Sequence, residues 1–198
     1  MKIAIYGGAF NPVHKGHIEI VKQLSEQFDF DKILIIPSKF SPHKSNKALV
    51  SDNDRLNMCK LAFNNIEKCE VSDIEIKRNN ISYTVDTLYE LRTIYPCDEI
   101  YLVCGSDMFL SLLDWRKPEE IFKMANILAF RRDNEDISKM NEYKKKINNL
   151  CKKVIICKVK IPPFSSTEVR NAIKENMPFQ NYVTKEIYSY IKDNKLYL

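Results

Sequence analysis

Short apolar runs alternate with amphipathic stretches along this chain. Five runs rich in Ile, Val and Leu predict buried strands, at residues 3–6, 32–36, 99–104, 126–130 and 154–159. Helical patterns occupy segments between and after these runs, at residues 18–28, 51–66, 84–95, 135–153, 165–173 and 183–191. Strands that alternate with helices predict an α/β fold. We expect a Rossmann-like, doubly wound and mostly parallel sheet with helices on both faces.

Some segments give more specific expectations. Residues 70–84 read as extended chain with a turn around Asn79-Asn80, and Thr84 is expected to cap the helix that follows. Ser51 with Asp54 resembles a capping pair, and Ser165 begins a similar pattern. No linker or internal repeat divides the chain, so residues 1–198 are expected to form one domain.

The composition narrows the environment and the partners. No apolar run approaches the ~18 residues of a membrane span, and the N-terminus enters a strand without a signal-peptide pattern. The six cysteines form no C-x-x-C pair and read as reduced thiols that mostly fill the core. We therefore expect a cytoplasmic protein with no membrane partner.

The net charge of +5 suits anionic small molecules such as nucleotides. It also fits weak, non-specific nucleic-acid contact, which would fall steeply with salt. The lysine runs at residues 144–146 and 152–153 read as solvated helix and turn surface. Nucleic acid is therefore not expected as a partner.

Glycine and histidine are scarce and concentrated. The chain has four glycines, far below the usual ~7%, at positions 7, 8, 16 and 105. It has three histidines, at positions 14, 17 and 43. Glycines placed so sparingly are expected where the backbone approaches a ligand or takes a positive φ.

Residues 3–17 combine a strand, a glycine turn and a helix start. Backbone N–H groups and the positive end of a helix dipole meet at such a junction, which suits a phosphate. A G-x-G-x-x-G pattern and a P-loop are both absent from the sequence. His14 and His17 are candidates to donate hydrogen bonds to phosphate oxygens. They could alternatively be helix caps or metal ligands, although no third ligand is apparent nearby.

Other polar residues follow other predicted strands. Gly105 and Asp107 come after one strand, Arg131 follows another, and Ser165-Ser166 lie a short loop beyond the last. Ligands of doubly wound sheets bind outside the carboxyl ends of the strands. We therefore expect these residues to surround the same crevice as residues 7–17.

Two segments resemble signatures of the nucleotidyltransferase superfamily. Residues 7–17 (GGAFNPVHKGH) resemble G-G-x-F-x-P-x-H-x-G-H, and residues 164–170 (FSSTEVR) resemble I-S-S-T-x-I-R. Three further segments resemble P-P-H-K, S-Y-T-x-D-T-L and G-x-D…W, at residues 42–44, 82–88 and 105–115. Together the set resembles the bacterial nicotinate-nucleotide adenylyltransferase family, from Met1 to the C-terminal helix.

The resemblance implies a reaction and a set of residues for it. ATP and nicotinate mononucleotide would give deamido-NAD and pyrophosphate by in-line attack, with Mg2+ held mainly by the phosphates. The implied catalytic residues are His14, His17, Lys44 and Arg170. The implied ATP-binding residues are Gly7, Gly8, Phe10, His14, His17, Gly105, Asp107, Ser165, Ser166, Thr167 and Arg170.

The resemblance also implies a site for the second substrate. Its implied residues are His43, Lys44, Thr84, Asp107, Trp115 and Arg131. Trp115 would stack on the pyridine ring, although a core or surface aromatic is the alternative. Thr84 and its neighbouring N–H groups would bind the carboxylate, a role compatible with a helix cap.

Two departures from the family pattern bear on these roles. Ser41-Pro42 stands where the family shows two prolines, and Arg131-Arg132-Asp133 replaces its usual R-P-G turn. The first bears on the rigidity of the loop, and the second bears on the role of Arg131.

Alternative functions make different predictions. The same chemistry could use nicotinamide mononucleotide or phosphopantetheine as acceptor, although His14 stands where phosphopantetheine relatives tend to have Thr. A catalytically silent nucleotide sensor would need affinity only and not groups aimed at transferred charge. The expected small-molecule partners are ATP and nicotinate mononucleotide. A homo-oligomer is compatible with the sequence.

Overall fold

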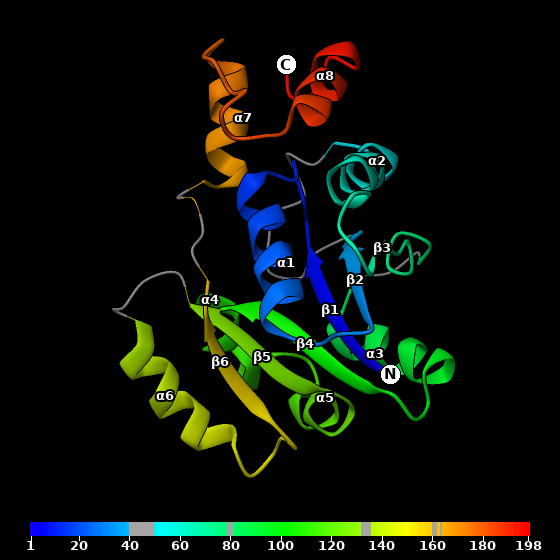
Figure 1. Ribbon diagram of the computed structural model, residues 1–198, viewed down its shortest axis with the longest axis vertical. Coiled ribbons are helices and arrows are strands. Elements are labelled where there is room, and N and C mark those ends of the chain that lie inside the picture. Colours follow the sequence, from blue (N-terminus) through cyan, green and yellow to red (C-terminus); the bar gives the residue numbers. More distant parts are fainter. Residues whose placement is uncertain (40–49, 79–80, 132–135, 160–161, 163) are drawn as a thin grey trace.

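One parallel sheet organises the molecule (Figure 1). The computed structural model describes residues 1–39, 50–78, 81–131, 136–159, 162 and 164–198. Six strands pair in the order β3-β2-β1-β4-β5-β6. Their bounds are β1 Lys2–Gly8, β2 Lys32–Pro37, β3 Cys69–Val71, β4 Glu99–Gly105, β5 Asn126–Arg131 and β6 Val154–Lys158. All five pairings are parallel.

The strand order confirms the doubly wound expectation. The chain builds outward from β1 to β3, then returns to the other side of β1 with β4 and builds outward to β6. The order therefore reverses between β1 and β4, which pair from Lys2 with Glu99 to Tyr6 with Val103. Such a reversal point is where ligands of these sheets bind.

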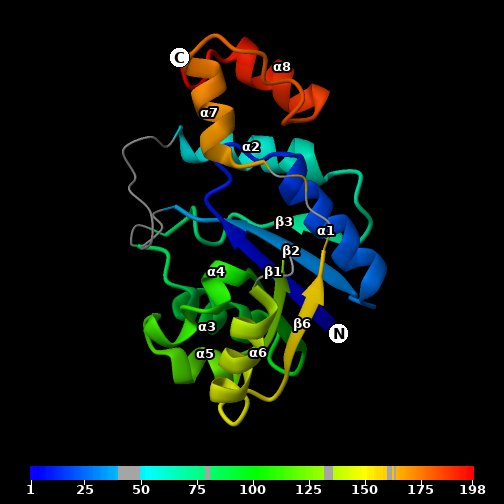
Figure 2. The ribbon, with the colours of Figure 1, turned by 90° about the vertical axis from the view of Figure 1, so that its left-hand side faces the viewer.

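Helices cover both faces of the sheet (Figure 2). Their bounds are α1 Lys15–Gln27, α2 Asp52–Phe63, α3 Thr84–Ile94, α4 Ser106–Phe109, α5 Pro118–Met124, α6 Asp136–Ile147, α7 Ser166–Lys174 and α8 Lys185–Asp193. The helices α1 and α2 lie on one face, and α3, α5 and α6 lie on the other. No helix in the described ranges is long and apolar enough to cross a membrane.

The alternation of side chains along β1 divides the core into two layers. Ile3 and Ile5 point into the layer of α3, α5 and α6, whereas Ala4 and Tyr6 point into the layer of α1 and α2. Successive side chains of a strand point to opposite faces, so a strand buried on both faces reads as a continuous apolar run. The helices α7 and α8 extend the α1 and α2 layer beyond the carboxyl end of β1 (Figure 1).

Three sequence-based expectations about elements were wrong. The sheet has six strands rather than five, because the short strand β3 pairs with β2. Residues 74–77 form turns rather than extended chain, since the Lys77 N–H bonds the Asp73 carbonyl at 3.0 Å. Thr84 lies inside α3, and Tyr83, whose backbone is extended, holds the N-cap position without a side-chain cap. The Asn79-Asn80 turn lies outside the described residues.

The expected helix starts at Ser51 and Ser165 are confirmed. The Ser51 side chain accepts a hydrogen bond from the Asp54 N–H, which begins α2. Ser165 and Glu168 form a reciprocal capping box at the start of α7. Each cap satisfies a backbone donor that the helix itself leaves unpaired.

The six cysteines are free thiols. Cys59, Cys104, Cys151 and Cys157 are buried, and Cys97 is exposed. Burial raises the pKa of the Cys151 thiol to about 12 and that of Cys157 to about 11. The thiolate is the reactive form, so these side chains are inert in the folded protein.

Cys97 is therefore expected to be the fast-reacting thiol of the native protein. Titration with an aromatic disulfide reagent at mildly alkaline pH should give one rapid equivalent, and denatured protein should give all six cysteines. Cys97→Ser should abolish the rapid phase. Several rapid equivalents in native protein would show that the core opens more readily than this packing allows.

Candidate active site

A tight loop joins β1 to α1 and forms the floor of the site. Phe10 has φ 44°, a left-handed conformation that costs a bulky residue about 1 kcal/mol or more. Its ring is buried and packs edge-on against Tyr6, His17 and Phe63. A Cβ atom on Gly8 would stand 3.2 Å from this ring, so a larger residue there would require the ring to shift by a few tenths of an ångström.

Of the two roles expected for the glycines, close approach or a positive φ, the structure shows no case of the second. None of the four glycines, all of which are described, has a positive φ. Phe10 takes the left-handed conformation instead, since its buried ring contacts stabilise it. Close approach is what Gly8 and Gly105 allow, because a Cβ atom on Gly105 would stand 2.9 Å from the Asp107 Oδ1 atom.

Three carbonyl groups of this loop are held by side chains from distant helices. The Ala9 carbonyl accepts from Arg55 at 2.8 Å, and Arg55 is fully buried in α2. The Asn11 carbonyl accepts from Arg170 at 2.8 Å. The Pro12 carbonyl accepts from the Ser166 hydroxyl at 2.9 Å, across 154 residues of sequence. The second signature segment is thereby fastened to the first.

His14 and His17 form a stacked pair at the start of α1. Their ring centroids are 3.7 Å apart, and His14 is buried. The His14 Nδ1 atom accepts from the Gly16 N–H at 3.1 Å, and the His17 Nδ1 atom accepts from the His14 N–H at 3.2 Å. An accepting ring nitrogen carries no proton, so in both neutral rings the proton is on Nε2. This reciprocal capping turns both imidazoles into donors.

The N-terminus of α7 adds further donors. Ser165 is its N-cap, with Ser166 and Thr167 in the first turn. The Arg170 guanidinium bonds the Thr167 hydroxyl at 3.2 Å in addition to the Asn11 carbonyl. The helix dipole and the guanidinium place positive charge on the same side of the loop.

One cleft of about 1020 Å³ collects these groups. This volume lies at the upper end of the range for small-molecule sites. The sequence-predicted residues that line it are Gly7, Gly8, Phe10, His14, His17, Thr84, Gly105, Asp107, Trp115, Ser165, Ser166, Thr167 and Arg170. Arg131 ends β5 and is not part of this lining. His43 and Lys44 lie outside the described residues.

The far end of the cleft has a different chemistry. Trp115 is half-buried, and its indole N–H donates to the Ser111 hydroxyl at 3.2 Å. Thr84 begins α3, a helix without a side-chain cap, so its first N–H groups face no capping side chain. An aromatic face and helix-start N–H groups suit a flat ring that bears an anionic substituent.

Sequence reasoning missed several cleft residues. Arg116 holds its guanidinium 4.5 Å from the centroid of the Tyr83 ring and 3.8 Å from the Asp86 carboxylate. Glu75 is buried and accepts from the Thr87 hydroxyl at 2.6 Å. Arg116 follows the tryptophan of the G-x-D…W segment, a position that could have drawn attention to it. Glu75 carried no such signal, because it precedes the S-Y-T segment across a turn.

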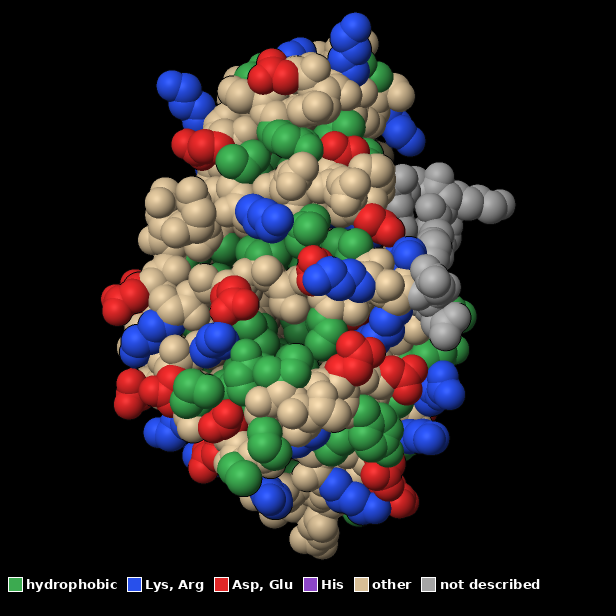
Figure 3. Space-filling view, turned by 90° about the vertical axis from the view of Figure 1, so that its right-hand side faces the viewer, with side chains coloured by type: hydrophobic (Ala, Val, Ile, Leu, Met, Phe, Trp, Pro, Cys, Tyr) green, Lys and Arg blue, Asp and Glu red, His purple; other side chains and the backbone are tan. Residues whose placement is uncertain are grey.

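The donor set of the cleft suits phosphate oxygens better than a metal ion. Imidazole N–H, guanidinium and helix-start groups all donate or carry positive charge, whereas Mg2+ requires oxygen ligands. Within the described ranges, no three His, Cys, Asp or Glu side chains are grouped so that they could hold a metal ion. On the face shown in Figure 3, basic and acidic side chains are interspersed.

Comparison with known proteins identifies the class. The family described as cytidylyltransferase-like matches residues 5–172, which include the loop after β1 and the start of α7. The chain belongs to this family of nucleotidyltransferases.

Full-length relatives identify the branch of that family. A protein of Fusobacterium nucleatum is 42% identical over 97% of this chain and 97% of its own length. A protein of Carboxydothermus hydrogenoformans is 35% identical over 99% of this chain and 98% of its own length. Both are named probable nicotinate-nucleotide adenylyltransferase. The chain belongs with the nicotinate-nucleotide adenylyltransferases.

A solved structure shows the same fold. It is Plasmodium falciparum nicotinic acid mononucleotide adenylyltransferase complexed with NaAD, with a TM-score of 0.79 and 21% identity. The alignment covers 99% of this chain and 97% of that chain. The Rossmann-like expectation is confirmed at the level of the whole topology.

Glu75 gives the site a pH-dependent contribution to stability. Burial raises the pKa of this carboxyl, and hydrogen bonds from Thr87 and Ser82 oppose only part of that shift. The folded protein therefore holds this proton at a pH where the unfolded chain has released it. This contribution to stability is fully present below the ordinary pKa of 4.5, and it is lost as the pH rises through the raised pKa of Glu75 in the folded protein.

Glu75→Gln should remove this dependence. The unfolding free energy of wild type relative to the variant should fall as the pH rises above 4.5, by at most about 1.4 kcal/mol per pH unit. Urea unfolding of both proteins over that range measures the difference. A difference in unfolding free energy between the two proteins that stays constant with pH would contradict a raised pKa of Glu75.

Proposed function

We propose that this protein transfers the adenylyl group of ATP to nicotinate mononucleotide, and forms deamido-NAD and pyrophosphate in NAD biosynthesis. The observation that carries the proposal is the cleft at the strand-order reversal, where residues of both signature segments meet. One end of the cleft carries donors for phosphates, and the other end carries an aromatic face beside a helix start. The full-length relatives bear the name of this activity.

The proposed reaction is one in-line displacement. A phosphate oxygen of nicotinate mononucleotide attacks the α-phosphorus of ATP and forms the new P–O bond. The bond from that phosphorus to the bridging oxygen breaks, and its electron pair leaves with pyrophosphate. Positioning and charge stabilisation are the main requirements of such a transfer, so no enzyme nucleophile is needed.

The proposed role of His14, His17 and Arg170 is to stabilise the departing charge. Both imidazoles present Nε2–H donors whose tautomer is held by the capping bonds. Arg170 brings a permanent positive charge while the Asn11 carbonyl orients it. Donors already in place before reaction lower the barrier without reorganising. Lys44 is proposed to assist from the 42–44 segment.

The remaining ATP-binding roles follow from position in the cleft. Gly7 and Gly8 let the nucleotide approach the end of β1, because neither carries a side chain. The Ser165–Thr167 turn is proposed to cradle phosphate with the N–H groups of Ser166 and Thr167 and with the Thr167 hydroxyl, because the Ser165 and Ser166 hydroxyls already donate to Glu168 and to the Pro12 carbonyl. Phe10, Gly105 and Asp107 shape the nucleotide side of the reversal point.

The nicotinate end of the cleft is proposed to recognise an acid rather than an amide. Trp115 offers a flat face for the pyridine ring, and the N–H groups at Thr84 face the carboxylate. The Arg116 guanidinium beside Tyr83 adds positive charge at this end. An amide carries no charge, so these groups would give it less stabilisation. Asp107, His43 and Lys44 complete the proposed set for this substrate, and Arg131 is proposed to contribute from the end of β5, outside the lining of the cleft.

Mg2+ is proposed to enter as the complex of ATP, bound mainly by phosphates and water. The cleft donors then bind the phosphate oxygens that the ion leaves free. The cytoplasm is the proposed location, since the six free cysteines suit a reducing compartment.

Pyrophosphate release from ATP and Mg2+ tests the proposal. Nicotinate mononucleotide, nicotinamide mononucleotide and phosphopantetheine should be compared in parallel at equal concentrations. We expect the nicotinate form to be the preferred acceptor. Preference for nicotinamide mononucleotide would retain the displacement and overturn the carboxylate site. Absence of turnover in folded protein that still binds ATP would instead favour the sensor.

His17→Ala tests the charge-stabilising role. Loss of one preorganised donor should lower kcat by about 10²–10³-fold, because the leaving charge loses its partner. Lys22→Ala, on the exposed side of the same helix, is the matched control and should retain wild-type kcat. Circular dichroism should show equal helix content in all three proteins. A His17→Ala enzyme with unchanged kcat would remove His17 from the mechanism.

A further inference from the structure

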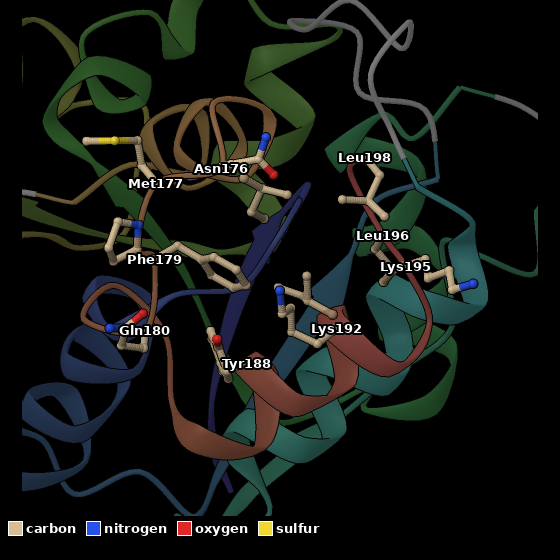
Figure 4. Close-up of a pocket in the computed structure, with 12 residues that line it drawn as sticks. Asn176, Met177, Phe179, Gln180, Tyr188, Lys192, Lys195, Leu196 and Leu198 are labelled. Carbon is tan, nitrogen blue, oxygen red and sulfur yellow. The ribbon is translucent and has the colours of Figure 1, made fainter.

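The last residues of the chain return to the active-site loop. After α8 ends at Asp193, Leu196 and Leu198 line a pocket of about 340 Å³ together with Phe179 and Tyr188 (Figure 4). The Leu196 N–H also bonds the Ile191 carbonyl at 3.0 Å. This bond and the packing of Leu196 and Tyr197 against the core hold the C-terminal segment to α8, whereas Leu198 is 83% exposed.

Tyr197 reaches the active-site loop from this fastened segment. Its hydroxyl donates to the Asn11 side-chain oxygen at 2.9 Å, across 186 residues of sequence. Burial raises the pKa of Tyr197 well above its ordinary value, although the positive charges of Arg170 and Arg55 oppose the shift. The hydroxyl therefore keeps its proton and remains a donor throughout the physiological range.

Asn11 connects this bond to the cleft. Asn11 is buried and lines the cleft beside His14. Its backbone carbonyl holds the Arg170 guanidinium at 2.8 Å, and its side-chain oxygen also accepts from the Val50 N–H at 3.4 Å. A shift of the Asn11 backbone would therefore move the carbonyl that holds the Arg170 guanidinium.

We propose that Tyr197 is a positioning residue of the active site. By holding Asn11, it orients the carbonyl that anchors Arg170, and so it completes the phosphate side of the cleft from the C-terminus. The inference rests on the proposed function, in which Arg170 stabilises the departing pyrophosphate. Tyr197 itself contacts neither substrate. Its effect should therefore appear in kcat and not in the binding of nicotinate mononucleotide at the far end.

Tyr197→Phe removes the hydroxyl and keeps the ring. The loss of a net hydrogen bond worth about 0.5–1.5 kcal/mol should lower kcat by about two- to thirteenfold. The KM for nicotinate mononucleotide should stay within about twofold of wild type, because the loss acts on the transition state. Steady-state pyrophosphate release measures both constants.

Tyr190→Phe is the matched control. Tyr190 also belongs to the C-terminal part, but its hydroxyl bonds Asp54 at 3.0 Å and Asn57 at 3.1 Å on α2 rather than Asn11. The Tyr190→Phe variant should have the wild-type kcat when it is assayed well below its melting temperature. Equal kcat in the two variants, or an unchanged kcat in Tyr197→Phe, would overturn the inference.

A double-mutant cycle separates positioning from general stability. In an Asn11→Ala background, Tyr197→Phe should cause no further loss of kcat, because the group through which it acts is gone. If Asn11→Ala does not fold, Arg170→Lys serves as the background. Additive losses would show that Tyr197 acts independently of this chain of contacts and would contradict the inference.

The outcomes also distinguish this inference from the proposed function. Failure of the wild type to turn over nicotinate mononucleotide with ATP would reject the function itself. A wild type that turns over normally, beside a Tyr197→Phe variant with equal kcat, would reject only the role of Tyr197.

Discussion

The site depends on how the carbonyl groups of the loop after β1 are satisfied. Arg55, Arg170 and Ser166 donate to the carbonyls of Ala9, Asn11 and Pro12. A buried carbonyl without a donor costs about 1–3 kcal/mol, so these bonds hold the loop in one conformation. The donating side chains also satisfy the partly negative carbonyl oxygens of the loop. The two histidines and the start of α7 line the same cleft as this loop.

The same contacts explain why two distant segments form one site. Parallel strands end at the same edge of the sheet, and the reversal between β1 and β4 opens a crevice there. The helix α7 follows the last strand and reaches back over β1, where Ser166 bonds the Pro12 carbonyl. The residues that line this part of the cleft are thereby carried on the starts of α1 and α7, while the sheet behind them is apolar.

The two ends of the cleft carry different side chains, as the proposed binding of two different substrates requires. The phosphate end has imidazoles whose tautomers are held by main-chain N–H groups, together with the Arg170 guanidinium. The other end has Trp115, the start of α3 and the Arg116 guanidinium. Each end therefore carries one guanidinium group, and that of Arg116 lies 3.8 Å from the Asp86 carboxylate. The buried Glu75 beneath the second end hydrogen-bonds Thr87, a residue of α3.

The alternation of apolar runs and helical patterns was sufficient to predict the doubly wound sheet. A strand that is buried on both faces has apolar side chains at consecutive positions, which the sequence shows directly. The scarce glycines and histidines, with the two signature segments, were sufficient to predict ten residues that line the cleft, and the further family-like segments added Thr84, Asp107 and Trp115. The sequence could not show that Phe10 rather than a glycine takes the positive φ, since that conformation is stabilised by a ring contact in the core. Nor could it show that Arg55 donates to the Ala9 carbonyl, that Thr87 donates to the Glu75 carboxylate or that Tyr197 donates to the Asn11 side chain. Those contacts join residues 12 to 186 positions apart, and only the packed tertiary structure decides which distant side chains meet.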